Sequence, residues 1–139
     1  MLFELIYRSE ADASVSNDDV MQILNAARDF NRQNGFTGCL LYNNRQFVQV
    51  LEGEFNALNI LYGKIRRDGR HKKVVTLHMQ EIEERSYPDW TMAFKSLEDE
   101  DMRSIAQALG VRELRELQGE EDESQISKKL FSMVAQSIT

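Results

Sequence analysis

Three uncharged polar residues stand where the sequence pattern calls for apolar side chains. Gln49 lies in the run FVQVLEGE, which is otherwise apolar until its closing acids, and Asn31 falls on the apolar stripe of a helix-like segment. Tyr7 ends the apolar face of the first strand-like run, FELIY. An unpaired buried amide costs about 1 to 3 kcal/mol, a large share of a domain stability of about 5 to 15 kcal/mol. These three side chains therefore need hydrogen-bond partners.

Two kinds of partner would satisfy them. Each side chain could pair separately with the backbone or with another side chain. Alternatively, all three could face one groove and bind a planar heterocycle with carbonyl and N–H edges, because amides pair well with such edges. The residues alone leave both explanations open.

Tyr7, Asn31 and Gln49 lie in segments with regular apolar spacing. The chain has six such segments, and a short strand follows them. Strands alternate with period two and helices repeat every three or four residues, so the two types can be told apart. We expect the N-cap of the first helix at Ser16 or Asn17 and its end before Gly35. In chain order we expect a strand at 3–7, a helix at 17–34, a hairpin with strands at 38–42 and 47–53, a helix at 55–65 that stops near Asp68-Gly69, a strand at 74–82 and a strand at 92–95.

The order β-α-β-β-α-β, followed by one more strand, predicts an α+β fold of the ferredoxin-like type. Two helices then pack side by side on one face of a mixed sheet, and the groove between them is the place for a ligand. After Leu97 we expect an appendix of two helices, 102–109 and 126–138, on the other face of the sheet. An acidic stretch with Gly110 and Gly119 separates them. We therefore predict a ligand-binding domain at 1–97 and a helical extension at 98–139, within one compact unit.

Composition excludes several classes of protein. A chain of 139 residues with 42% apolar and 29% charged residues suits one soluble domain. No run is long and apolar enough for a membrane span, and the N-terminus has no signal-peptide pattern, so we expect a cytoplasmic protein without a membrane partner. The single cysteine, Cys39, cannot form an internal disulfide, and His71 and His78 have no nearby thiol with ligand spacing. We expect no metal site.

Charge is unevenly distributed along the chain. Residues 98–123 contain ten acids and three arginines, and the net charge of the whole chain is −6. The acids could keep the tail soluble or dock a partner. Long nucleic acid is a poor partner for an acidic chain with one small basic cluster. That cluster is either a helix end whose cations complement the dipole or an anion contact, such as a phosphate. Its members are Lys64, Arg66, Arg67, Arg70, Lys72 and Lys73.

Several spaced motifs together resemble the BLUF family, the blue-light receptor domains that use FAD. The resemblance runs from Leu5 to Met92, and the order and separation of its motifs make it specific. The motifs are IYRS at 6–9, FNRQNGFTGCLLY at 30–42, FVQVLEGE at 47–54, DGRH at 68–71 and RSYPDWTM at 85–92.

The resemblance implies a set of flavin-binding residues. Tyr7 matches the family's electron and proton donor, and Gln49 matches the glutamine that bridges this tyrosine and the flavin. Asn31 matches the asparagine that holds the carbonyl and N–H edge of the flavin. The remaining implied contacts are Ile23 and Ile65 on the two ring faces, Asp68, Arg70 and His71 at the far side of the pocket, and also Arg28 and Phe47.

The implied function is that of a blue-light photoreceptor that binds flavin noncovalently, as FAD, with FMN or riboflavin open. Light would drive electron and proton transfer from Tyr7, and rotation or tautomerisation of Gln49 would then exchange donor and acceptor. The result is a reversible red-shifted state. Trp90 and Met92 match the family's signalling residues, although Trp90 could equally be an ordinary packed aromatic. Ala27 stands where many relatives have a serine, so the resemblance does not imply tuning by a hydroxyl group at this position.

Output would pass to an unknown separate protein, or through self-association into a dimer or larger homo-oligomer. Two other classes stay open. One is a flavin-binding interaction module that does not respond to light. The other is a small enzyme on the same scaffold, using Asn31, Arg70 and His71, but it lacks a convincing nucleophile and base, so we expect no enzyme.

Overall fold

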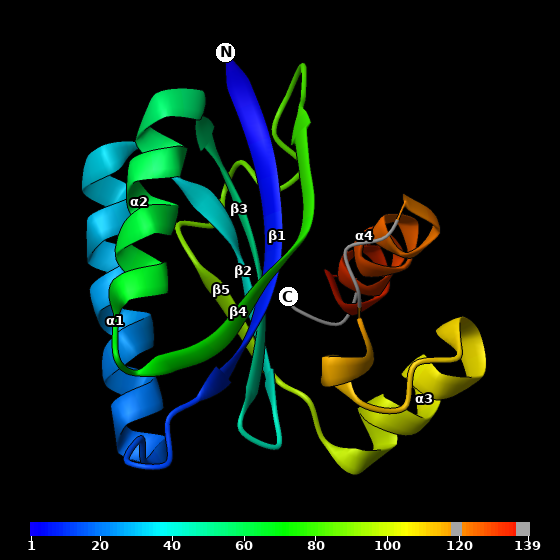
Figure 1. Ribbon diagram of the computed structural model, residues 1–139. Helices are drawn as coiled ribbons and strands as arrows, with labels where there is room; N and C mark the ends of the chain where they lie inside the picture. The colour runs from blue at the N-terminus through cyan, green and yellow to red at the C-terminus, as the bar shows by residue number, and fades with distance from the viewer. Residues whose placement is uncertain (118–120, 136–139) are drawn as a thin grey trace.

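A computed structural model describes residues 1–117 and 121–135, with the side chains of 1–117 and 127–135. The chain forms three layers, in which one sheet lies between two groups of helices (Figure 1). The elements are β1 (Leu2–Ala11), α1 (Asn17–Asn34), β2 (Thr37–Asn43), β3 (Gln46–Glu54), α2 (Phe55–Arg67), β4 (His71–Glu81), β5 (Ala93–Ser96), α3 (Asp99–Leu109), the 3-10 helix η1 (Leu114–Glu116) and α4 (Glu121–Ala135).

The sheet has the strand order β4-β1-β3-β2-β5. β5 runs parallel to β2, and the other neighbouring strands are antiparallel. This is the predicted ferredoxin-like arrangement with its added strand, so the fold prediction is confirmed. The β1–β3 register pairs Tyr7 with Gln49. Directly opposed residues of two strands point to the same face, so the sheet brings these two side chains together.

Local signals set the ends of the first helix and the hairpin as predicted. Ser16 caps α1 with a capping box, and Gly35 ends it with a left-handed φ of 74°. The hairpin turns at Asn44 and Arg45, whose φ values of 46° and 64° are both left-handed. A two-residue turn of this kind needs positive φ at both positions, which asparagine adopts more readily than most residues.

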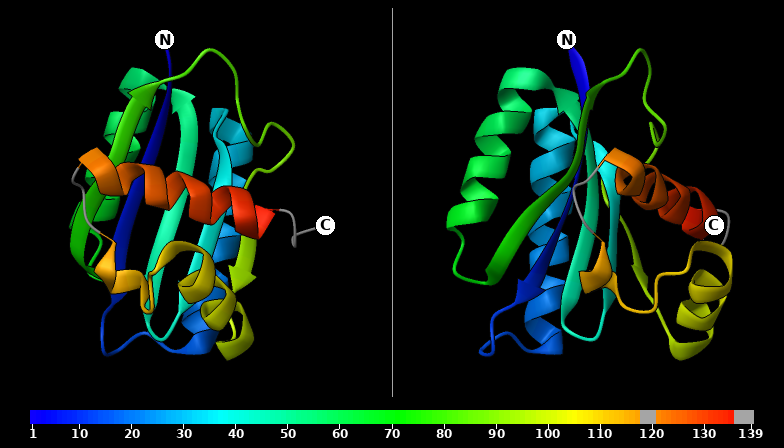
Figure 2. Two further views of the ribbon diagram at one scale, coloured as in Figure 1. Left: turned by 90° about the vertical axis from the view of Figure 1, so that its right-hand side faces the viewer. Right: turned by 45° about the vertical axis from the view of Figure 1, so that its right-hand side comes forward.

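Each face of the sheet has its own hydrophobic core. We call the face that α1 and α2 cover the first face, and the face that α3, η1 and α4 cover the second face (Figures 1 and 2). Alternation along each strand assigns the side chains, so Tyr7 belongs to the first core and Ile6 to the second. Figure 2 shows α4 crossing the strands of the second face. There Leu130, Phe131 and Val134 pack with sheet residues.

Several element boundaries differ from the prediction. β1 continues beyond Tyr7 to Ala11 because β3 and β4 both pair with it there, and β4 begins at His71. α3 begins at Asp99, so the first acids of the acidic stretch form a helical turn, where the helix dipole favours negative charge.

The region before the last helix also differs from the prediction. The short helix η1 was not predicted, and it packs the buried Leu114 and Leu117 on the sheet. α4 begins at Glu121, before the predicted start. Gly119 and Ile138 lie outside the described residues.

Candidate functional site

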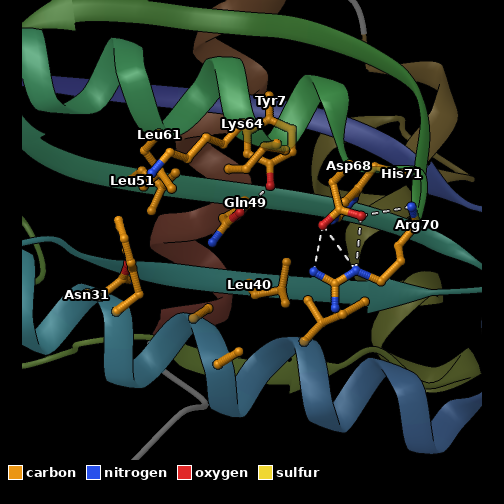
Figure 3. A pocket seen from close by; sticks show the side chains of 15 residues that line it. Tyr7, Asn31, Leu40, Gln49, Leu51, Leu61, Lys64, Asp68, Arg70 and His71 are labelled. Atoms are coloured by element: carbon orange, nitrogen blue, oxygen red, sulfur yellow. Dashed lines mark hydrogen bonds and ion pairs between the residues drawn. The ribbon is translucent and has the colours of Figure 1, made fainter.

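A cavity of about 200 Å³ lies on the first face, between α1 and α2. The sheet forms its floor, and Figure 3 shows side chains from both helices pointing into it. Most residues that the sequence analysis assigned to a flavin line this cavity. These are Tyr7, Ile23, Asn31, Gln49, Ile65, Asp68, Arg70 and His71.

A chain of hydrogen bonds runs along the floor of the cavity. The Tyr7 hydroxyl donates to Gln49 Oε1, and Gln49 Nε2 donates to Met92 Sδ at 3.3 Å. Tyr7 is 1% and Gln49 6% exposed. Burial raises the pKa of Tyr7 far above its ordinary value, and the nearby Tyr62 and Asp68 raise it further. Tyr7 is therefore a neutral phenol that still carries its proton, placed on the acceptor atom of an amide.

Asn31 lies at one end of the cavity, and Asp68 and Arg70 lie at the other, with Gln49 between them (Figure 3). Asn31 Nδ2 donates to Thr91 O at 2.7 Å. Among the described residues, nothing donates to Asn31 Oδ1, although the residue is 2% exposed. Asn31 lines the cavity, so this oxygen is available to a ligand.

Charged groups gather at the opposite end. An ion pair joins Arg70 to Asp68 at 2.5 Å. The hydrogen bonds from Arg70 hold the pKa of Asp68 below its ordinary range, so the carboxylate stays ionised. His71 Nδ1 bonds to Ser9 Oγ at 2.9 Å, and burial lowers the pKa of His71. A neutral imidazole therefore closes this end.

Other assigned residues lie beside the cavity rather than on its wall. Phe47 is fully buried and packs against the ring of His71, with 5.2 Å between the ring centroids. Arg28 Nε donates to Met92 O at 2.9 Å. Trp90 stacks on Tyr87 and packs with the second core, so Met92, not Trp90, contacts Gln49.

Several residues that line the cavity were not predicted to do so, and Lys64 was predicted only as a possible anion contact. Lys64 lies on the α2 face of the cavity, with Nζ 5.6 Å from the centroid of the Phe30 ring. Leu61 is another lining residue of α2. The helical spacing of Leu61, Lys64, Ile65 and Asp68 was a signal that could have found them.

A match to a family model identifies the kind of domain that contains this cavity. The model of the BLUF domains, described as sensors of blue light using FAD, matches residues 2–93. The chain belongs to the BLUF family. Domains of this family are blue-light sensors that bind flavin.

The relatives of this BLUF chain include proteins much longer than the chain and proteins of similar length. The chain is 48% identical over 92 residues to photoactivated adenylate cyclase subunit beta of Euglena longa. The matched region covers 66% of this chain and 11% of that protein. The chain thus spans about a tenth of the length of such curated relatives. Two solved structures are matched almost from end to end. The dark-state structure of the BLUF protein BlrB is 31% identical, with a TM-score of 0.77 and 97% and 96% of the two chains covered. The photo-activated state of BlsA is 29% identical, with a TM-score of 0.84 and coverages of 96% and 94%.

The residues of the cavity fit a flavin. Its ring system is planar and apolar on both faces, and Ile23 from α1 and Ile65 from α2 give it two apolar walls. Its carbonyl and N–H edge needs amide partners, and Asn31 and Gln49 present them. Lys64 and Arg70 add two cationic side chains to the lining of the cavity.

The described ranges contain neither a helix that is long and apolar enough to cross a membrane nor a cluster of potential metal ligands.

Proposed function

We propose that light acts on this blue-light sensor through Tyr7 and Gln49. The observation that supports this most strongly is the buried hydrogen bond from the Tyr7 hydroxyl to Gln49 Oε1, on the wall of a cavity that fits a flavin ring. A neutral tyrosine is a poor electron donor in darkness. It becomes useful when a strong oxidant is generated beside it.

Blue light supplies that oxidant by exciting the bound flavin. Tyr7 would then pass an electron and its phenolic proton to the flavin and would recover both from it before the cycle ends. While the proton is away, the hydrogen bond to Gln49 Oε1 is lost, and the amide can pair differently. Rotation or tautomerisation exchanges the donor and acceptor atoms of a glutamine at almost unchanged shape. The lasting product is a different set of hydrogen bonds at Gln49.

We propose FAD as the bound flavin, held noncovalently. Ile23 and Ile65 would hold the two ring faces, and Asn31 would hold the carbonyl and N–H edge. Arg28 would support the site by holding the backbone of Met92, and Phe47 would support it by packing against the ring of His71. Lys64 and Arg70 favour a phosphorylated flavin over riboflavin, and the family description, which names FAD, favours FAD over FMN.

Output would begin at Met92, because Gln49 Nε2 already contacts its sulfur. A change at Gln49 would reach Trp90, two residues away. We propose that residues 1–97 form the photosensory domain and that 98–139 are the extension that carries the signal. The extension would act on a separate cytoplasmic protein or through self-association, as a sensor and not as an enzyme.

Absorption spectra recorded before and after blue light test this function. The proposal expects bound flavin with a small red shift that appears in light and decays in darkness. Bound flavin that shows no shift would instead support a light-insensitive binding module. A colourless protein that takes up no flavin would support the small-enzyme alternative.

A further inference from the structure

The loop between β4 and β5, residues 82–92, is attached to the cavity at its end near β5. Gln49 Nε2 donates to Met92 Sδ at 3.3 Å, and Asn31 Nδ2 donates to Thr91 O at 2.7 Å. Both donors line the flavin cavity. Two hydrogen bonds therefore join this end of the loop directly to the amide groups of the site.

A buried carboxylate holds the other end of the loop. Glu52 has no exposed surface, and it faces away from the cavity. Its oxygens accept hydrogen bonds from Ser86 N at 2.6 Å, from Tyr87 N at 3.1 Å and from Thr37 Oγ1 at 2.9 Å. A buried carboxylate is retained only where donors of this kind satisfy it, and hydrogen bonds to a charged group are the strong ones. The loop is thus tied to the middle of the sheet.

Arg85 adds a second attachment at the same end. Its guanidinium donates to Thr37 Oγ1 at 2.7 Å, to the backbone oxygen of Glu52 at 2.9 Å and to Gly35 O at 2.7 Å. Because these acceptors belong to the end of α1 and to strands β2 and β3, the attachment spans three elements. Such a network leaves little freedom at this end of the loop.

We infer that Glu52 and Arg85 are positioning residues that fix the far end of the loop. Because that end is fixed, a change in the contact between Gln49 and Met92 has to be taken up between the two attachments. Trp90 lies in that interval. The inference rests on the proposed function, because it assigns a route for the change that light makes at Gln49.

The conformation of the interval makes Trp90 a sensitive point. Its ring stacks on Tyr87 with 5.2 Å between centroids and 8° between planes. Its carbonyl accepts from Gly38 N at 2.9 Å. Tyr87 is held by Glu52, so the partner of the Trp90 ring is fixed, whereas Met92, whose sulfur contacts Gln49, lies on the other side of Trp90. A shift of Met92 would therefore change the stacking of the indole.

The experiment uses Trp90, the single tryptophan of the chain, as the reporter. Two quantities are measured on the full chain loaded with flavin. The first is the quenching of Trp90 fluorescence by iodide in darkness, which needs no photochemistry. The second is the light-induced change in Trp90 emission divided by the light-induced flavin red shift.

The variants are Glu52→Gln and Arg85→Met, with Ser86→Ala as the matched control. Ser86 is exposed, and its backbone N–H, not its side chain, makes the bond to Glu52. We expect iodide quenching to rise at least twofold in both test variants, and the ratio of emission change to red shift to fall at least threefold, with the red shift itself retained. Ser86→Ala should match the wild type in both quantities. If Glu52→Gln fails to fold, Arg85→Met decides, because Arg85 is only partly buried.

Unchanged quenching and an unchanged ratio in Arg85→Met would overturn the inference. A merely structural role would lower the melting temperature and leave the ratio unchanged, and that result would also overturn it. A wild-type chain with no red shift would overturn the proposed function instead. The dark quenching would then still decide whether this pair fixes the loop.

Discussion

Two buried polar sites on opposite faces of the sheet differ in their hydrogen bonding. On the second face, the carboxylate of Glu52 receives three hydrogen bonds from the protein. On the first face, Asn31 keeps an oxygen that no described residue donates to, and Gln49 relies on a weak sulfur acceptor. β3 therefore carries Glu52, whose hydrogen bonds are satisfied, on one face, and Gln49, which lines the ligand cavity together with Asn31 of α1, on the other. Saturated hydrogen bonding fixes a structure, whereas available hydrogen-bonding groups allow it to bind and switch.

The largest expected effect comes from removing one partner of the hydrogen bond between Tyr7 and Gln49. Tyr7→Phe removes the donor to Gln49, and Gln49→Ala removes the amide, so either change should abolish the light-induced red shift. Difference absorption spectra measure it. Tyr42→Phe is the matched control, because Tyr42 lies outside the cavity against Phe47, and its spectrum should shift normally. A normal reversible shift in Tyr7→Phe or Gln49→Ala would remove that residue from the mechanism.

A core substitution on the second face should affect stability and leave the photochemistry intact. Phe131 is 2% exposed and packs between α4 and the sheet. Phe131→Ala should lower the free energy of unfolding by about 3 to 5 kcal/mol, because it removes a buried aromatic side chain and leaves a cavity. Urea denaturation measures the loss. A red shift that disappears from the folded variant would show that the two faces are not separable.

A substitution of an apolar residue on the first face should have the opposite result. It should weaken flavin binding more than it lowers stability. Ile65 is half-buried and borders the cavity. Ile65→Ala should weaken flavin binding by about 1 to 2 kcal/mol, roughly tenfold, through lost apolar contact. Its effect on the unfolding of the flavin-free chain should be smaller than that of Phe131→Ala. Flavin titration followed by fluorescence compares the variants, and unchanged affinity would mean that Ile65 does not touch the ring.

A smaller effect should distinguish the flavins. Arg70 is exposed, and its ion pair with Asp68 contributes little to stability. Arg70→Gln should weaken the binding of FAD and FMN by about 1 kcal/mol or less, up to roughly fivefold, and leave riboflavin affinity unchanged. Equal losses for all three flavins would rule out a phosphate contact.

The smallest expected effect is an absence of change with pH. Burial raises the pKa of Tyr7 well above its ordinary value of 10.0, so the phenol keeps its proton in moderately alkaline solution. The red shift should keep its amplitude between pH 8 and about pH 10. By linkage, the folded state then binds this proton more tightly, and stability should fall as the pH rises above 10. An amplitude that titrates near pH 9 would contradict the burial of Tyr7.

Local signals made much of the fold predictable, and long-range contacts account for what was missed. Ser16, Gly35 and the Asn44-Arg45 turn act within a few residues, so the sequence states their effect directly. The helix η1 forms because Leu114 and Leu117 find buried places on the sheet, which periodicity cannot reveal. Tyr7, Asn31 and Gln49 were visible as polar residues in apolar places.

The attachment of the loop to Glu52 was not visible in this way. The backbone donors of Ser86 and Tyr87 lie more than thirty residues from Glu52 in the chain. Every residue except proline has a backbone N–H, so the sequence pattern does not show which of them donates to Glu52. That Met92, and not Trp90, contacts Gln49 likewise depends on how the whole loop is held.

The central claim is that light changes the hydrogen bonds of Gln49 while Tyr7 and the flavin return to their starting states. An infrared difference spectrum between light and darkness, with glutamine labelled by carbon-13 at its side-chain carbonyl, tests it most directly. We predict difference bands that move with the label, decay at the rate of the red shift and vanish in Gln49→Ala. A reversible red shift without any label-sensitive band would contradict the claim.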